Sequence, residues 1–354
     1  MIHGGDIYDK NIIYDFSVNL NPLGCPDRVK DALKASLENA DRYPDYYQRR
    51  VREAIGKAEG VSPTKVIGGN GASELLMAVV RMISPKSALI ISPGFNGYRH
   101  ILSAVPACRV IEYKLSEEND FALDEGLLEY ITPELSAVIM ANPNNPTGRC
   151  IHPELTDRIY ETCFKTGTAL VSDESFIKLS SGGKSLADKT ADYEDLYVIN
   201  AYTKLFAIPG VRAGYLMAHE RSIERLRGYL PEWNMSVPAQ EAAVAAAEVL
   251  GSSSFLADTI KAVTNERDYL SNSLKSKGIK VYPSDTCYIM LQTDTELYEQ
   301  LLSEGIMIRK LETVPGLKKG FYRIAVRRHE DNAYLIQTIK SIIKDEYDRT
   351  YITK

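Results

Sequence analysis

The chain of 354 residues is 44% hydrophobic and 25% charged, and its 42 basic and 47 acidic residues give a formal charge of −5. This composition excludes collagen-like, disordered and coiled-coil proteins. The small negative charge supplies no field that would attract nucleic acid or an anionic membrane, so neither is expected as a partner. A chain of this length buries about 75% of the surface that its unfolded form exposes, which allows a large core and a deep site.

The cysteines are five in number, lie far apart and never form a CxxC pair. This spacing favours neither a disulfide framework nor a zinc site, so we expect no metal and a reducing, cytoplasmic setting. The first ten residues have no basic start followed by an apolar run, and no window reaches the roughly 18 apolar residues of a membrane span.

The first part of the chain is expected to be an N-terminal arm with one amphipathic stretch, residues 29–37. From about residue 60 to 220, short apolar runs alternate with helix-like stretches, which predicts a mostly parallel sheet covered by helices. The runs predicted as strands are residues 87–92, 108–113, 136–141, 168–173 and 196–201. The predicted helices between them include residues 72–83 and 154–167, the second ending at Gly167.

After Pro238 an alanine-rich run leads to a long polar helix over residues 255–277. Short strands then follow within residues 281–291, 305–311 and 321–326, before a closing helix over 331–345. We therefore expect an N-terminal arm over residues 1–45, a large α/β domain over 46–240 and a small α+β domain over 241–354.

In open α/β sheets ligands bind beyond the carboxyl ends of the strands. The run GGNGASELL, residues 68–76, follows Val66 and Ile67 and opens a helix, whose first N–H groups suit an anion such as phosphate. An ordinary strand-to-helix turn is the alternative. The run is not a GxGxxG, and no acidic residue ends the next strand, so a nicotinamide dehydrogenase has less support.

Three further strand ends carry chemistry. NPNNPTG, residues 142–148, forms either a rigid loop with free amide donors or a plain tight turn. Asp173 ends an apolar run and is a candidate ligand or a helix cap. Lys204 follows the next run among apolar neighbours, where a lowered pKa would favour a Schiff base over a solvated charge. Arg212 suits a phosphate oxygen.

An anion-binding helix start, an amide loop, an acid, a lysine and an arginine, each after a strand, together describe a pyridoxal phosphate site. In this order the chain resembles the fold type I aminotransferases of classes I and II along nearly its whole length. The resemblance implies a mostly parallel seven-stranded sheet in a large domain, a smaller α+β domain at the C-terminus, pyridoxal 5′-phosphate as cofactor and a homodimer with shared active sites.

The resemblance also assigns roles to individual residues. Lys204 would form the Schiff base and shuttle a proton, and Asp173 would bind the pyridine nitrogen. Asn145 would donate to the phenolic oxygen of the cofactor. The residues that would hold the cofactor's phosphate are Gly71, Ala72, Ser73, Thr203 and Arg212, with Tyr43 reaching in from the partner subunit. Phe95 would stack on the ring with Tyr98 nearby, and the substrate would meet Arg323, Arg309, Asn19 and His3.

Two branches of that family fit best, the histidinol-phosphate aminotransferases and the threonine-phosphate decarboxylases of cobalamin synthesis. HGGDIY, DFSVNLNPLG and DESF, with Phe176, are closer to the decarboxylases, whereas KLETV at 310–314, Cys287-Tyr288 and Ala201 depart from them. The first hypothesis is an aminotransferase acting on an amino acid or a phosphorylated amine. The alternatives are a threonine-phosphate decarboxylase and a cofactor-binding protein without turnover.

Overall fold

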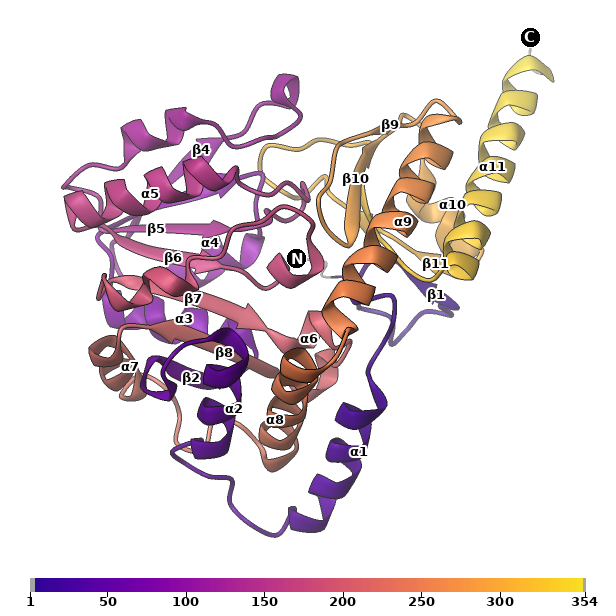
Figure 1. Cartoon of the computed structure of the whole chain (residues 1–354). Coiled ribbons are helices and arrows are strands. Elements are labelled where there is room, and N and C mark those ends of the chain that lie inside the picture. Colours follow the sequence, from indigo (N-terminus) through magenta and orange to yellow (C-terminus); the bar gives the residue numbers. More distant parts are fainter. Residues whose placement is uncertain (1–3, 353–354) are drawn as a thin grey trace.

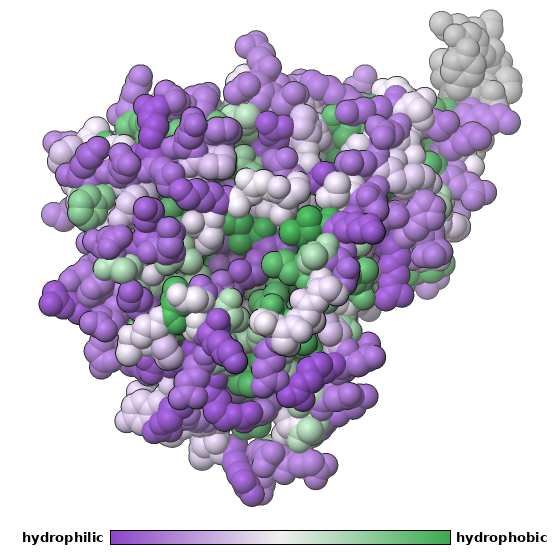
Figure 2. Space-filling model, in the orientation of Figure 1, coloured by the Kyte–Doolittle hydropathy of each residue, from purple (hydrophilic) through white to green (hydrophobic). Residues whose placement is uncertain are grey.

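A computed structural model describes residues 4–352 of the chain, with side chains up to residue 344. A large sheet flanked by helices forms one side of the molecule, and a smaller sheet with the long C-terminal helix forms the other (Figure 1). On the face drawn in Figure 2, hydrophilic residues cover most of the surface and hydrophobic ones gather near the middle.

The large sheet has seven strands in the order β2-β8-β7-β6-β5-β3-β4. All neighbouring pairs are parallel except those of β8, which runs antiparallel to both β2 and β7. The strands are β2 Val66–Asn70, β3 Ser87–Ser92, β4 Arg109–Lys114, β5 Ala137–Ala141, β6 Ala169–Asp173, β7 Leu196–Ala201 and β8 Ala213–Ala218. The predicted mostly parallel seven-stranded sheet is confirmed.

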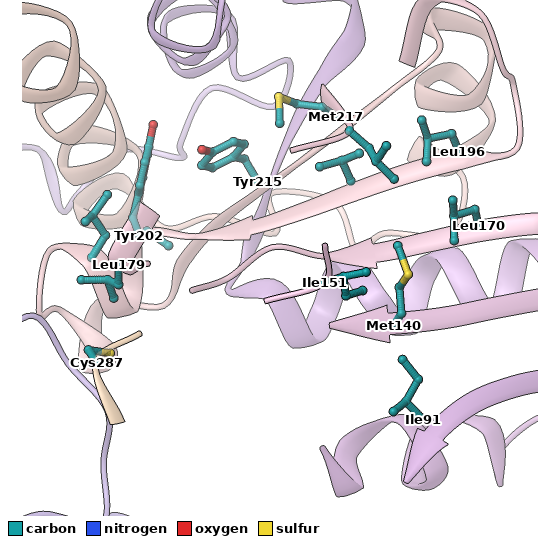
Figure 3. Packing of buried hydrophobic residues seen from close by; sticks show 14 of the residues in the cluster. Ile91, Met140, Ile151, Leu170, Leu179, Leu196, Tyr202, Tyr215, Met217 and Cys287 are labelled. Carbon is teal, nitrogen blue, oxygen red and sulfur yellow. The ribbon is translucent and has the colours of Figure 1, made fainter. Parts of the chain in front are cut away.

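Both faces of this sheet are buried, which explains why its central strands are continuous apolar runs rather than alternating ones. Alternate residues of each strand enter different hydrophobic clusters: in β3, Leu89 and Ile91 join one, and Ala88 and Ile90 the other. Figure 3 shows the first cluster, with Ile91, Met140, Leu170 and Leu196 on successive strands of the sheet.

The helices before and within the large sheet are α1 Asp27–Ser36, α2 Arg49–Glu59, α3 Ala72–Ile83, α4 Asn96–Leu102, α5 Pro153–Thr166, α6 Tyr202–Leu205 and α7 Glu220–Arg227. Those that follow it are α8 Val237–Ser252, α9 Phe255–Lys275, α10 Leu297–Ser303 and α11 His329–Ile352. Helix α8 packs against α1 and α2, and its alanines lie in the same cluster as the large sheet. Among residues 4–352 no single helix is both long and apolar enough to span a membrane, although α8 and α9, bent by 85°, meet the criterion as a pair.

The smaller sheet is antiparallel, in the order β12-β13-β10-β9. Its strands are β9 Lys280–Val281, β10 Tyr288–Gln292, β12 Arg309–Lys310 and β13 Phe321–Ala325. Beside it, β1 Tyr14–Asp15 of the N-terminal arm pairs in parallel with β11 Ile306–Met307. Phe16 enters the third hydrophobic cluster with α9, α10 and α11, so the arm packs on the C-terminal part of the chain.

Several elements differ from the sequence prediction, among them β8, α2 and β2. β8 was not predicted, because it follows Arg212 directly without a polar turn, and α2 was not predicted in the turn-rich N-terminal segment. The glycine run after Val66 and Ile67 was expected to open a helix, but β2 continues through both glycines to Asn70, since pairing with β8 extends it. The domain boundaries at 45/46 and 240/241 stay predictions, and helix α8 runs across the second of them.

Candidate active site

A cavity of about 260 Å³ lies where the carboxyl ends of β5, β6 and β7 meet the N-terminal arm and the strands β12 and β13. The parallel strands end at the same edge, so residues far apart in the sequence come together there. The predicted residues that line the cavity are Asn19, Ala72, Ser73, Phe95, Asn145, Asp173, Thr203, Lys204, Arg212, Arg309 and Arg323. Among residues 4–352, His, Cys, Asp and Glu form no group of three or more that could hold a metal ion.

The start of α3 forms an anion site at one end of the cavity. Its N-cap Gly71 makes no side-chain cap, so the first N–H groups of the helix face the cavity with the positive end of the helix dipole. Gly71 has φ +77, and a Cβ there would lie 2.5 Å from the Arg212 guanidinium. Arg212 itself adopts the left-handed region, φ 62, and this brings its side chain over the helix start.

Lys204 lies in the short helix α6, directly after β7. The backbone of this helix is held from the N-terminal arm: Asn21 donates from its N–H to the Lys204 carbonyl at 3.0 Å and from its amide to the Leu205 carbonyl at 2.8 Å. Burial, and next the Arg323 charge, lower the pKa of Lys204 to about 8. The amine is therefore more easily deprotonated than an ordinary lysine, which a nucleophile requires.

Asp173 ends β6 and is held by three hydrogen bonds. The Tyr98 hydroxyl donates to Oδ2 at 2.8 Å, and the Ser175 N–H and hydroxyl donate to Oδ1 at 3.0 and 2.5 Å. Burial, and then Asp173 itself, raise the pKa of Tyr98 well above its usual value, so this hydroxyl stays a donor. Each carboxylate oxygen retains lone pairs, and the group can accept a further N–H from the cavity.

Asn145 and Arg323 meet across the cavity. The guanidinium donates from Nη1 to Asn145 Oδ1 at 2.6 Å and from Nη2 to the Ser17 carbonyl at 2.6 Å. Since Asn145 accepts through its oxygen, its NH₂ group is left as a donor. Arg323 Nε is buried without a hydrogen-bond partner among residues 4–344, and Arg309 lies opposite Arg323 on the neighbouring strand. Burial lowers the pKa of Arg323 to about 10.

The remaining predicted residues have mixed outcomes. Asn19 is buried and lines the cavity, and its Oδ1 has no hydrogen-bond partner within the part of the chain that the structure describes. Phe95 lines the cavity and contacts the Tyr98 ring edge-on at 5.4 Å. Tyr43 is 81% exposed and packs against Trp233 at 4.8 Å, outside the cavity of its own chain. His3 lies outside the described residues, while the following Gly4 lines the cavity.

Several residues of the site escaped sequence reasoning. Ser17 and Ser175 hold charged groups in place, and Asn144 anchors the amide loop through its side chain, which donates to the Pro93 carbonyl at 2.9 Å. Asn144 lies within NPNNPTG and Ser175 within DESF. The motifs therefore indicated the correct segments, but not which residue of each segment makes these contacts. Ser17 acts through its backbone carbonyl, which no side-chain pattern reveals.

The residues present fit pyridoxal phosphate. The cavity offers an uncapped helix start beside an arginine for a phosphate group, a carboxylate for a ring N–H, an amide donor and an amine of lowered pKa. Two buried polar atoms of residues that line it, Asn19 Oδ1 and Arg323 Nε, have no hydrogen-bond partner among the described residues, and a ligand would satisfy them.

Comparison with known proteins agrees with this site. Residues 11–339 match the family "Aminotransferase class I and II". The chain therefore belongs to this family, whose members depend on pyridoxal phosphate. The fold is that of the fold type I aminotransferases.

Individual relatives fall into the two branches expected. Threonine-phosphate decarboxylase of Salmonella typhimurium is 30% identical over 96% of this chain and 96% of its own. Histidinol-phosphate aminotransferase of Thermococcus gammatolerans is 31% identical over 93% of this chain and 91% of its own. The crystal structure of histidinol-phosphate aminotransferase from Clostridium acetobutylicum superposes with a TM-score of 0.86 at 25% identity, covering 94% of this chain and all of that one.

Proposed function

We propose that the protein is a pyridoxal phosphate-dependent aminotransferase, which moves an amino group between an amino acid or phosphorylated amine and a 2-oxo acid. The observation that carries this proposal is the 2.6 Å hydrogen bond from Arg323 to Asn145. Asn145 is the residue expected at the phenolic edge of the cofactor ring, so Arg323 would hold a substrate carboxylate beside Asn145 at that edge.

The position of the carboxylate matters because the cofactor, when bound, weakens whichever bond of the substrate α-carbon stands perpendicular to its ring. A carboxylate held by Arg323 beside Asn145 would favour loss of the α-proton over loss of CO₂. Lys204, whose pKa of about 8 lies near physiological pH, then accepts and returns that proton. Asp173, fixed by Tyr98 and Ser175, stabilises positive charge on the ring nitrogen.

A second anionic group on the substrate would be recognised by Arg309. This residue lies opposite Arg323 in β12 and lines the same cavity, so two guanidinium groups face one substrate. Arginine binds carboxylate and phosphate through paired N–H donors. The proposed substrates are therefore amino acids with an acidic side chain and phosphorylated amines of the histidinol phosphate type.

Threonine-phosphate decarboxylase is the second candidate function. It is favoured by a relative of that name which aligns over 96% of both chains, and by the N-terminal segment, whose Gly4 lines the cavity. In that reaction the carboxylate would stand out of the ring plane and leave as CO₂, and Arg323 and Arg309 would hold the phosphate instead.

We also propose a homodimer in which Tyr43 completes the neighbouring site. Tyr43 is exposed beside Trp233 and Tyr46, as expected for a residue that acts across an interface. Its hydroxyl would add a donor to the phosphate site at the start of the partner's α3.

A single-turnover experiment separates the two reactions. The cofactor-loaded protein is mixed with common amino acids, histidinol phosphate and threonine phosphate in turn, while the visible spectrum and released CO₂ are recorded. Conversion of the cofactor to its pyridoxamine form without CO₂ is expected. Release of CO₂ from threonine phosphate, with the original spectrum restored, would replace the aminotransferase with the decarboxylase. A Lys204→Ala variant is the blank for both.

A further inference from the structure

Tyr288, the first residue of β10, is a buried residue next to the cavity but not in its lining. Its ring contacts Phe176 edge-on at 5.1 Å and lies under the Arg323 guanidinium, 5.5 Å from the ring centre. Cation–π contact of this kind restricts where a guanidinium can lie. The ring therefore supports Arg323 in addition to its two hydrogen bonds.

The hydroxyl of Tyr288 reaches a different part of the site. It donates to the Asn144 carbonyl at 3.0 Å, and the same carbonyl accepts the Gly148 N–H at 2.8 Å. The Asn144 amide in turn donates to Pro93 and Thr147 at 2.9 and 3.0 Å. Tyr288 thus fixes the backbone directly before Asn145. Burial raises the pKa of Tyr288 well above its usual value, so the hydroxyl stays a donor.

We propose that Tyr288 is a positioning residue that sets Asn145 and Arg323 together, its hydroxyl holding the loop of the first and its ring supporting the second. The two groups are themselves joined by the 2.6 Å hydrogen bond, so a shift of either moves the other. An effect of Tyr288 on turnover rests on the proposed function. The placement of Asn145 and Arg323 by Tyr288 concerns only the cofactor and anion sites.

The test removes the hydroxyl and keeps the ring. Tyr288→Phe is compared with Tyr193→Phe, a matched control, because the Tyr193 hydroxyl is also buried and also donates to backbone carbonyls, those of Cys163 and Thr168, away from the cavity. Two readouts are taken on the cofactor-loaded protein: the dissociation constant of inorganic phosphate by calorimetry, and the pH midpoint of the visible absorption.

Tyr288→Phe is expected to weaken phosphate binding about fivefold, the usual effect of one hydrogen bond. The pH midpoint is expected to rise by about 0.5 unit, because the Arg323 charge disfavours a positive charge at the Lys204 nitrogen and would lie less firmly beside it. The other titratable groups that act on Lys204 are Cys287, Arg212 and Asp173. Cys287 precedes Tyr288 in the chain and is kept in Tyr288→Phe, and the hydroxyl that this variant removes donates to the Asn144 carbonyl rather than to any of the three. Tyr193→Phe is expected to leave both quantities unchanged.

A double-mutant cycle with Asn145→Ala shows whether the effect passes through the loop. If Tyr288 acts through Asn145, Tyr288→Phe has a smaller effect in the Asn145→Ala background than in the wild type. Wild-type values of both readouts in Tyr288→Phe, or effects that simply add in the cycle, would overturn the proposal. Because neither readout depends on which reaction occurs, failure of the aminotransferase proposal would be seen separately.

Discussion

Lys204 owes its reactivity to where the chain places it. It follows β7 in a four-residue helix, its carbonyl is held by Asn21, and burial and Arg323 lower its pKa to about 8. The Lys204 ammonium lies 5.9 Å from the Phe176 ring, so part of its surroundings is apolar. The same burial that lowers the pKa also excludes water from a proton transfer.

The lowered pKa predicts how the cofactor-free protein reacts with pyridoxal phosphate. Only the neutral amine attacks the aldehyde, so the rate should rise about tenfold per pH unit below pH 8 and level off above it. Stopped-flow absorbance measures this rate. Arg323→Met removes a charge that lowers the pKa of Lys204, so the rate should reach its plateau at a higher pH. A wild-type rate that continues to rise to pH 10 would contradict the assignment.

At the scale of elements, the site is built from the ends of strands and the start of one helix. β5, β6 and β7 run parallel and deliver the amide loop, Asp173 and Lys204 to one edge. α3 begins at Ala72 without a side-chain cap, which leaves its N–H groups for an anion. The position of Arg212 over that helix start depends on the absence of a side chain at Gly71.

Gly71→Ala is therefore expected to raise the dissociation constant of pyridoxal phosphate by about tenfold or more, because the new Cβ would meet the Arg212 guanidinium and the backbone has φ +77. Equilibrium titration of the cofactor-free protein measures it. Gly167→Ala is the control, since Gly167 has a similar φ of +73 but no atom within 4 Å of an added Cβ. Equal affinities in the two variants would show that Arg212 does not need this space.

Glu174, which follows the last residue of β6, is expected to make the stability of the fold depend on pH. It is fully buried, accepts hydrogen bonds from Ser172, Ser185 and the Leu186 N–H, and burial raises its pKa to about 7. Between pH 4.5 and 7 the folded state binds more protons than the unfolded chain. Stability is therefore greatest below the unfolded pKa and declines as pH rises through about 7.

Glu174→Gln should remove this decline, worth about 1 to 3 kcal/mol between pH 5 and 8. Urea unfolding at several pH values measures it, with Glu194→Gln, at a side chain 43% exposed, as the control. The same slope in Glu174→Gln and wild type would assign the decline to other groups.

The comparison of sequence and structure is clearest for these elements. The parallel strands and the residues that follow them could be predicted, because buried runs and turn residues are local signals. β8 and the full length of β2 depend on pairing between distant segments. Ser17 accepts a hydrogen bond through its backbone carbonyl, and Tyr288 donates to the backbone carbonyl of Asn144. Such roles depend on tertiary contacts that residue types alone do not reveal.

At the scale of the whole molecule, the active site joins two hydrophobic cores. The residues proposed to bind the cofactor follow strands of the large sheet, while Arg309 and Arg323 come from the small one. The two parts are tied beside the cavity, where the Asp285 carboxylate accepts from the Cys150 N–H and the Asp285 backbone N–H donates to the Gly148 carbonyl, both at 2.8 Å. Substrate recognition thus depends on the relative position of both sheets.

A site completed by a second chain predicts complementation. Tyr43→Phe and Lys204→Ala variants, each of low activity alone, should form mixed dimers in which one site has both native residues. Subunits are exchanged, the mixed species is confirmed by mass spectrometry, and activity is compared with that of each parent. The mixed species should be clearly more active than either parent, even where it recovers less than about a quarter of wild-type activity. No rise after confirmed exchange would argue against the contribution of Tyr43.

The account depends most on Lys204 as the residue that binds the cofactor. Borohydride reduction of the cofactor-loaded protein, followed by peptide mass mapping, tests this directly. The account predicts one reduced phosphopyridoxyl group per chain, on the peptide that contains Lys204, and none in Lys204→Ala. A label on another lysine in the wild-type protein would contradict the site described here.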